Sequence, residues 1–553
     1  MKNNIGIRCQ AYGHLLGLVL LATPGLAAQA ALTDLSDTPL VNDAGLVVRP
    51  NMMFVLDNSG SMDFNFTPDN VAYDANAWPG IQSNRGNRSG VCRAHNYVTW
   101  NGDVINGTTI CGGANSSGTT PTDGGDPPFY SPQFNTSYYN PTIRYSPPPN
   151  PCNPSQSLPS MTDWTEVLVQ GHAIDASCVQ TAAHGKVNLL TQYPERVYCA
   201  RADSSVDGDS CKQNGIDDTD RSDGDYDYPI SSSTHSSSFS YAKTLPSHPH
   251  YYLIEPTQYC TDSSLTTCGN LSKGRQIPTY VRYCKGISSS TCQAKFDSDE
   301  GYVYPHFGNF IRHDIIPSIT SYPKAAGRDD CAGATCTYAE EMTNFANWYA
   351  YYRTRMQTMK SAAGQAFSTI DDALRVGFVT INPGDPVDST QYLPIADFDS
   401  TQKTAWYQKF YNINPNGGTP LREALSRVGR HYANVTGGIN EGMPEDPVQY
   451  ECQQNFSLLT TDGYWNGASG DKIDGSSIGN QDNVNAGYST RAIGAFDGNL
   501  SGASNTLADV AMYYYRTDLR PGMPDKVPTN DKDTAPHQHM VTFTLGLGLD
   551  GLL

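Results

Sequence analysis

The stretch that decides the fold is Pro50-Asn-Met-Met-Phe-Val-Leu-Asp57, and Asn-Ser59-Gly-Ser61 follows it at once. Its apolar run is typical of a strand that is buried on both faces, as the strands of a parallel sheet are. Asp57, Ser59 and Ser61 then supply one carboxylate and two hydroxyls at alternate positions. Ligands of open α/β sheets gather at the carboxyl ends of the strands. We therefore expect a parallel sheet with a group of oxygen ligands at the end of this strand.

Regular structure is next predicted from residue 338 onward. Apolar residues three and four apart predict one helix of about 29 residues from Tyr338 to Ala366, with Arg353 and Lys360 on its other side. Further strands and helices then alternate along the chain: Val376–Ile381, Thr419–Tyr432, Phe456–Thr460, Leu507–Tyr515 and Val541–Leu545. That order is typical of a wound α/β sheet with parallel strands.

The segment between these two parts has a different composition. From about Asn65 to Thr337 it is rich in Ser, Gly, Asn, Pro and Tyr, and it holds 12 of the 14 cysteines. We expect such a loop-rich region to hold its shape through disulfides more than through a large core. The sequence therefore predicts one α/β domain with a Cys-rich insertion. Residues 31–63 begin the domain, residues 64–337 form the insertion and residues 338–553 complete the domain.

The cysteine spacing suggests local disulfides in a compartment where disulfides persist. Six pairs lie close in sequence and leave Cys452 over: Cys92/Cys111, Cys152/Cys178, Cys199/Cys211, Cys260/Cys268, Cys284/Cys292 and Cys331/Cys336. This pairing is the simplest hypothesis, because connectivity does not follow from sequence alone. No C-x2-C pair occurs, which argues against a structural zinc site.

Residues 1–30 have the pattern of a signal peptide. Lys2 and Arg8 provide the positive charge, Leu15–Leu21 the apolar run and Ala28-Gln-Ala30 a cleavage site. The apolar run is too short to span a bilayer, and no other stretch of the sequence is long enough. We expect an exported chain in the periplasm, at the outer membrane or on the cell surface. Its formal charge of -19 argues against nucleic acid or anionic lipid as the main partner.

Two more polar motifs are expected at the same edge of the sheet as Asp57. Gly417-Gly-Thr419-Pro420 precedes a predicted helix, and Thr460-Thr-Asp462-Gly463 ends a predicted strand. Each motif also has an ordinary reading, because Thr419 is a suitable helix N-cap and Asp462-Gly463 suits a turn. Together they add a third hydroxyl and a second carboxylate, which are ligands that Mg²⁺ prefers.

The run D-x-S-x-S, G-G-T-P and T-D-G resembles the metal-ion-dependent adhesion site of von Willebrand factor A domains. The resemblance implies the fold of that family, a Rossmann-like, mostly parallel α/β sheet. It also implies that Ser59, Ser61 and Thr419 bind a divalent cation, with Mg²⁺ favoured and Ca²⁺ or Mn²⁺ as alternatives. Asp57 and Asp462 would contribute directly or through water. An open position on the cation would take a carboxylate or other oxygen from a partner.

Longer strings resemble the PilY family of type IV pilus biogenesis factors and pilus-tip adhesins. They are residues 344–355, 452–463, 505–513 and 539–551, and the likeness covers about residues 33–63 and 338–553. The resemblance implies a non-catalytic role in type IV pilus assembly and metal-dependent surface adhesion. Implied partners are minor pilins, the pilus tip, and a host or abiotic surface ligand that presents a carboxylate. The family usually continues into a C-terminal β-propeller, which we expect this chain to lack.

Two other functions stay open. One is a non-adhesive periplasmic factor for pilin assembly or its regulation, and the other is an exported hydrolase. Against an enzyme, the sequence has no H-E-x-x-H motif, no G-x-S-x-G elbow and no Walker loop. We expect His537 and His539 to be solvated or structural and not metal ligands.

The position of the insertion carries one more expectation. In ordinary A domains the D-x-S-x-S loop leads directly into the first helix, whereas about 270 residues separate Ser61 from Tyr338 in this chain. Both insertion points lie beside the predicted cation site. We therefore expect the insertion to overhang the binding face, where it would either form a partner-selective surface or cap the metal.

Overall fold

The structure is a computed structural model. It describes residues 46–65, 67, 130–133, 135–196, 309–463, 465–481 and 503–547, with short segments between 198 and 307 and strands at 7–8, 92–98 and 104–111. The predicted signal peptide, residues 1–30, lies outside the described residues apart from the two-residue strand β1. Within the described part of the chain, no helix is long and apolar enough to cross a membrane.

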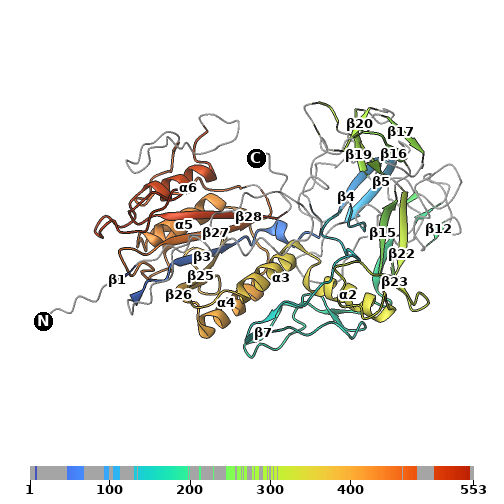
Figure 1. Ribbon diagram of the computed structural model, residues 1–553, viewed down its shortest axis with the longest axis horizontal. Helices are drawn as coiled ribbons and strands as arrows, with labels where there is room; N and C mark the ends of the chain where they lie inside the picture. Colours follow the sequence, from blue (N-terminus) through green and yellow to red (C-terminus); the bar gives the residue numbers. More distant parts are fainter. Residues whose placement is uncertain are drawn as a thin grey trace.

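A five-stranded sheet forms the centre of one lobe of the molecule (Figure 1). Four neighbouring strands are parallel, and the edge strand β26 is antiparallel to β25. In sheet order the strands are β26 (Tyr392–Asp397), β25 (Arg375–Thr380), β3 (Asn51–Leu56), β27 (Asn455–Thr461) and β28 (Met540–Gly546). All of β3 is buried because it lies in the middle of the sheet, as its apolar run predicts.

Helices cover both faces of this sheet, because successive side chains of β3 point to opposite sides. Met52, Phe54 and Leu56 pack in one apolar cluster with α3 (Arg355–Ser368) and α4 (Ser400–Asn412). Met53 and Val55 pack in the other cluster with α5 (Leu421–Tyr432) and α6 (Leu507–Arg516). The strands and helices expected from Val376 onward are present, while β26 and α4 were not expected. The assignment to the von Willebrand factor A family stays a prediction.

The single helix predicted from Tyr338 to Ala366 is wrong. The chain forms α2 (Tyr338–Tyr351) and α3, with a break between them. The Thr354 side chain accepts a hydrogen bond from the Gln357 backbone N–H, and the Gln357 side chain accepts one from the Thr354 backbone N–H. This capping box starts a new helix. The apolar periodicity gave no sign of the break between α2 and α3, because it continues across the break.

The expectation that Arg353 and Lys360 lie on the other side of that helix, away from its apolar stripe, is wrong as well, since both are buried. Lys360 donates to the backbone carbonyls of Tyr411 and Ile413 at 2.7 and 2.6 Å. Those carbonyls belong to the end of α4, the helix that was not predicted. The Lys360 ammonium therefore has its hydrogen bonds from the end of α4, a neighbour that the apolar periodicity of residues 338–366 could not indicate.

The second lobe contains most of the described part of residues 64–337, and α2 packs within it (Figure 1). Its core is aromatic, with Tyr139 and Tyr193 against Phe345 at ring-centroid distances of 4.9 and 5.2 Å. Figure 1 shows this lobe beyond the end of the sheet where the 3₁₀ helix η2 (Gly60–Asp63) follows β3. The domain boundaries, and the choice between a partner-selective surface and a cap, stay predictions.

Short strand pairs account for much of the regular structure of this lobe. Those with described pairing are β4 (Cys92–Val98) with β5 (Val104–Cys111), β6 (Pro149–Asn150) with β7 (Asn153–Ser157), β8 (Val167–Leu168) with β9 (Lys186–Val187), β10 (Tyr193–Arg196) with β14 (Thr244–Ser247), β11 (Tyr198–Cys199) with β12 (Cys211–Lys212) and β13 (Tyr228–Pro229), β15 (His250–Glu255) with β22 (Asn309–Asp314), β16 (Gln258–Cys260) with β17 (Cys268–Asn270) and β18 (Ile277–Pro278), β19 (Val281–Cys284) with β20 (Cys292–Gln293) and β21 (Tyr304–Phe307), and β23 (Tyr322–Pro323) with β24 (Thr335–Cys336). Elsewhere β1 (Ile7–Arg8) pairs with β2 (Leu46–Val47), and η4 is Gly438–Asn440.

Four of the six predicted disulfides are confirmed: Cys152–Cys178, Cys260–Cys268, Cys284–Cys292 and Cys331–Cys336. Cys92 and Cys111 are opposite each other in β4 and β5, as are Cys199 and Cys211 in β11 and β12. The sulfur positions of those two pairs lie outside the described residues. The expectation that Cys452 is left over is wrong, because it is disulfide-bonded. Local spacing cannot reveal a distant partner.

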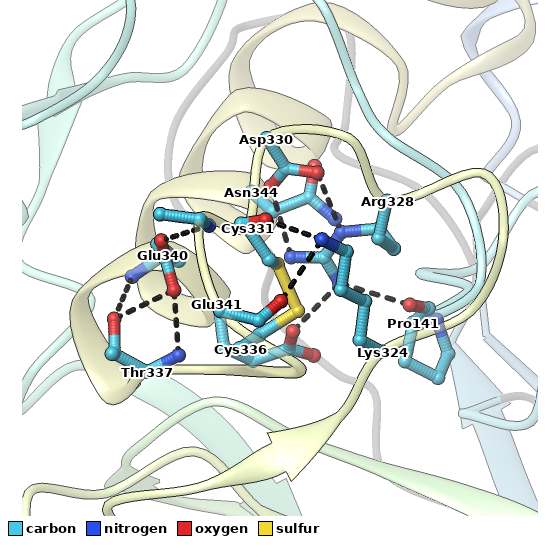
Figure 2. The surroundings of a disulfide bond; sticks show 12 residues. Pro141, Lys324, Arg328, Asp330, Cys331, Cys336, Thr337, Glu340, Glu341 and Asn344 are labelled. Atoms are coloured by element: carbon cyan, nitrogen blue, oxygen red, sulfur yellow. Dashed lines mark hydrogen bonds and ion pairs between the residues drawn. A yellow bond between two sulfur atoms is a disulfide. The ribbon is translucent and has the colours of Figure 1, made fainter.

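Next to the disulfide Cys331–Cys336, a buried ion pair joins Arg328 of the insertion to Glu341 of α2 (Figure 2). Arg328 donates to Glu341 of α2 at 2.7 Å and to the carbonyl of Pro141 at 2.9 Å, and both charged side chains are fully buried. Glu341 also accepts from the Tyr139 hydroxyl at 2.7 Å. Each charge is therefore paired and hydrogen-bonded, which a buried ion pair requires.

Candidate metal site

The two predicted carboxylates lie side by side because their strands are parallel neighbours. Asp57 follows β3 and Asp462 follows β27, and Val55 and Leu459 are register partners. Oδ1 of Asp57 accepts from the Ser59 backbone N–H at 2.8 Å, and Oδ2 accepts from the Asp462 backbone N–H at 3.4 Å. The sheet register therefore fixes both aspartates at one edge.

A chain of hydroxyls connects to these carboxylates. Ser61 Oγ donates to Asp462 Oδ1 at 2.8 Å, and the Oγ atoms of Ser59 and Ser61 are 3.0 Å apart. Because Ser61 gives its hydrogen to Asp462, it accepts the hydrogen of Ser59. Four of the five predicted ligands thus form one hydrogen-bonded group. The D-x-S-x-S turn brings three of them together, and β27 brings the fourth.

Thr419 lies on the same edge, in a loop that is bonded to the first. Gly60 N–H donates to the Gly417 carbonyl at 3.1 Å. Thr419 is buried, and its backbone N–H donates to Asn466 Oδ1 at 2.8 Å. Among the hydrogen bonds of the described residues, none joins the Thr419 hydroxyl to the other four residues. It does not cap α5 either, since that helix has no side-chain cap.

Burial dominates the electrostatics of the carboxylates. The pKa of the Asp57 carboxyl is raised to about 6, mainly by burial and secondly by the negative charge of Asp462, while hydrogen bonds from Ser59 oppose the rise. Burial likewise raises the pKa of the neighbouring Asp63 to about 6. Two carboxylates that share a buried place favour a cation between or beside them.

A cation that the sequence reasoning missed already contacts this site. Arg355 Nη1 donates to Asp462 Oδ2 at 2.9 Å, and both side chains are buried. Arg355 is the first residue of α3, so the same T-x-x-Q signal that starts the helix also places this side chain. Asn466, which holds the Thr419 backbone, was missed too. No sequence signal linked either residue to the site.

The donor set fits a hard divalent cation better than a transition metal. No group of three or more His, Cys, Asp or Glu side chains that could hold a metal occurs in the described part of the chain. The candidate site has two carboxylates, and its other side-chain donors are hydroxyls. Mg²⁺ usually keeps several waters and takes only one or two carboxylates from the protein. His537 and His539 are buried, and His539 contacts Asp533 at 3.2 Å, away from these five residues.

Part of the chain is similar in sequence to known proteins. The type IV pilus biogenesis factor PilY1 of Pseudomonas aeruginosa strain PAK is 32% identical over 239 residues, which is 38% of this chain and 20% of the relative. The PilY1 proteins of strains PAO1 and UCBPP-PA14 are 27% and 33% identical over 322 and 263 residues. These matches show that part of this chain is similar to part of the PilY1 proteins.

The similarity extends over part of this chain and a smaller part of each relative. The matches cover 52% and 43% of this chain for PAO1 and UCBPP-PA14, and 25% and 22% of those PilY1 proteins. This chain therefore spans a fifth to a quarter of the length of the PilY1 relatives. Those relatives are described by their names as type IV pilus biogenesis factors. No family model and no solved structure matches the chain.

Proposed function

We propose that this chain is a von Willebrand factor A-type module of type IV pilus biogenesis that binds partners through a divalent cation. The observation that carries the proposal is the hydrogen-bonded group of Asp57, Ser59, Ser61 and Asp462 at the ends of two parallel strands. Its oxygens are of the types that Mg²⁺ takes, with Ca²⁺ or Mn²⁺ as alternatives. The similarity to PilY1 supports the pilus role.

In this proposal Ser59, Ser61 and Thr419 hold the cation with their hydroxyls, and Asp57 and Asp462 balance its charge. When bound, the cation would supply an open position for a carboxylate oxygen of the partner. The hydrogen bond between Gly60 and Gly417 keeps the two hydroxyl-bearing loops together. The second lobe lies beyond the end of the sheet at which these residues are found. We therefore propose that this lobe selects the partner, such as a minor pilin, the pilus tip or a surface ligand.

A cation-dependent stability measurement tests this proposal. The full chain is unfolded thermally in EDTA and in excess Mg²⁺, Ca²⁺ or Mn²⁺, because a ligand that binds only the folded state stabilises it. At a hundred times the Kd, the expected gain is about 2.7 kcal/mol. Ser61→Ala should remove most of the gain. The matched control is Ser457→Ala, which changes a buried serine in the middle of β27 and should keep the gain. An identical unfolding temperature with and without every cation would refute the site.

A second candidate function is pilus assembly without adhesion. The relatives' own name, biogenesis factor, favours it. The two functions differ in what the chain binds. Capture of minor pilins by the immobilised full chain, with no retention on host cells or abiotic surfaces, would favour assembly. Cation-dependent retention on such surfaces, abolished by Ser61→Ala, would favour adhesion.

A further inference from the structure

We propose that the Arg355 guanidinium supplies a fixed positive charge to the candidate site. This charge weakens the binding of a divalent cation in the absence of a partner. It also makes the cation-loaded site favour an anionic ligand. This inference rests on the proposed function, since it concerns the same site. It differs from that proposal because the arginine is no part of the five-residue motif. Its role would be to position Asp462 and to set the charge of the site.

The contacts of Asp462 define this role. Its Oδ2 accepts from Arg355 at 2.9 Å, and its Oδ1 accepts from Ser61 at 2.8 Å. Asp462 is fully buried, and the Arg355 side chain is 1% exposed. Both carboxylate oxygens therefore already have a donor, and one of the donors is charged. A divalent cation that draws on Asp462 has to compete with the guanidinium for the same negative charge.

The position of Arg355 is set by the first residue of the inserted segment and by the N-terminal cap of α3. Its backbone N–H donates to the Phe64 carbonyl at 2.9 Å, directly after η2, and its guanidinium lies over the Phe64 ring at 5.4 Å. Thr354 caps the same turn of α3. The arginine is therefore held where the chain leaves the sheet domain and where it returns. A shift of Phe64 or of the start of α3 would move the charge that faces Asp462.

The charge balance gives the functional consequence. Asp57 and Asp462, when ionised, with Arg355 leave one formal negative charge, and a bound divalent cation turns this into one positive charge. Without Arg355 the loaded site would be neutral. A buried positive charge favours an anionic oxygen from a partner more strongly than a neutral site does. By linkage, a partner that supplies the carboxylate then tightens cation binding by the same factor.

Calorimetric titration of the full chain with Mg²⁺ or Mn²⁺ at pH 8, without any partner, tests the inference. Arg355 Nη1 lies 2.9 Å from Asp462 Oδ2. Removing this positive charge should tighten cation binding, so Arg355→Gln should lower the cation Kd at least about tenfold. Arg355→Lys keeps the unit positive charge, so the Kd should stay within about threefold of the wild type. The matched control is Arg328→Gln, which removes an equally buried arginine from the ion pair with Glu341 and should leave the Kd unchanged.

The outcomes separate this inference from the proposed function. If the wild type binds no cation, the metal site itself is refuted, and the inference falls with it. If the wild type binds and Arg355→Gln binds equally or more weakly, only the inference is refuted. Should Arg355→Gln fail to fold, Arg355→Lys decides the question. A Kd within threefold of the wild type supports a charge role, and a tenfold change in either direction overturns it.

Discussion

Ser61 donates its hydroxyl hydrogen to Asp462 over 2.8 Å, although 401 positions separate the two residues in the sequence. The contact exists because β3 and β27 are parallel neighbours and both end at the same edge of the sheet. It joins a turn that precedes the insertion to a turn that follows it. The site is therefore complete only when the sheet has assembled across the inserted segment.

Replacing Asp57 should separate metal binding from stability. Burial raises the pKa of its carboxyl to about 6, so the ionised form is costly in the folded protein without metal. Asp57→Asn removes that charge, and we expect the free energy of unfolding in EDTA to stay within about 1 kcal/mol of the wild type or to rise. The gain from Mg²⁺ should disappear. Chemical unfolding with and without Mg²⁺ measures both, and a retained gain would contradict the assignment of Asp57.

Acid should destabilise the fold partly through His431. Burial lowers the pKa of this histidine to about 4, whereas an unfolded histidine has a pKa near 6.5. The unfolded state therefore binds more protons between these values, and stability falls as the pH drops from about 6.5 to 4. The loss is roughly 3 kcal/mol for this residue. Urea unfolding in EDTA across that range should show a flatter pH dependence for His431→Gln. A curve that parallels the wild type would exclude His431 as a contributor.

The ion pair between Arg328 and Glu341 should matter more than surface pairs. Arg328→Met leaves Glu341 buried without its cation, so we expect a loss of about 3–5 kcal/mol in the free energy of unfolding. Lys186→Ala is the control, because Lys186 and Glu166 form an exposed pair at 2.6 Å. That variant should lose no more than about 1 kcal/mol. Equal losses in urea titrations of the two variants would show that the Arg328 pair does not anchor the insertion.

Phe54 should be among the most sensitive positions of the sheet. Its ring has no exposed surface and lies 5.2 Å from Phe367, 5.4 Å from Trp406 and 5.5 Å from Phe410. Phe54→Ala therefore opens a cavity against three aromatic rings and should cost about 3–5 kcal/mol. Ile143→Ala, at a side chain that is 41% exposed, should change stability by less than about 0.5 kcal/mol. Denaturant unfolding compares the two. A small effect at Phe54 would mean that the core relaxes around the gap.

Local signals in the sequence predicted the elements that build the site. The apolar run before Asp57 identified β3, since only a central strand needs six consecutive buried residues. Close cysteine spacing gave four disulfides, because short strand pairs bring such residues opposite each other. The motifs placed Asp57 and Asp462 at corresponding ends of two predicted strands, and the structure shows that these strands are neighbours.

The features that sequence reasoning missed depend on tertiary contacts. Lys360 is buried because α4 offers two carbonyl groups, and no local pattern encodes that neighbour. Arg355 contacts Asp462 across 107 positions, so periodicity could not connect them. The start of α4 did carry a signal, because Asp399 accepts hydrogen bonds from the backbone N–H groups of Thr401 and Gln402. An aspartate before a helix is a strong cap.

The central claim, a divalent cation held by the five residues, is tested most directly by anomalous X-ray diffraction from crystals of the full chain soaked with Mn²⁺. We expect one anomalous peak within about 2.5 Å of the Ser59 and Ser61 hydroxyl oxygens, with Thr419 facing it. The peak should disappear in Ser61→Ala crystals. If saturating Mn²⁺ gives no peak at the ends of β3 and β27, or if Ser61→Ala leaves the peak unchanged, these residues do not hold a divalent cation.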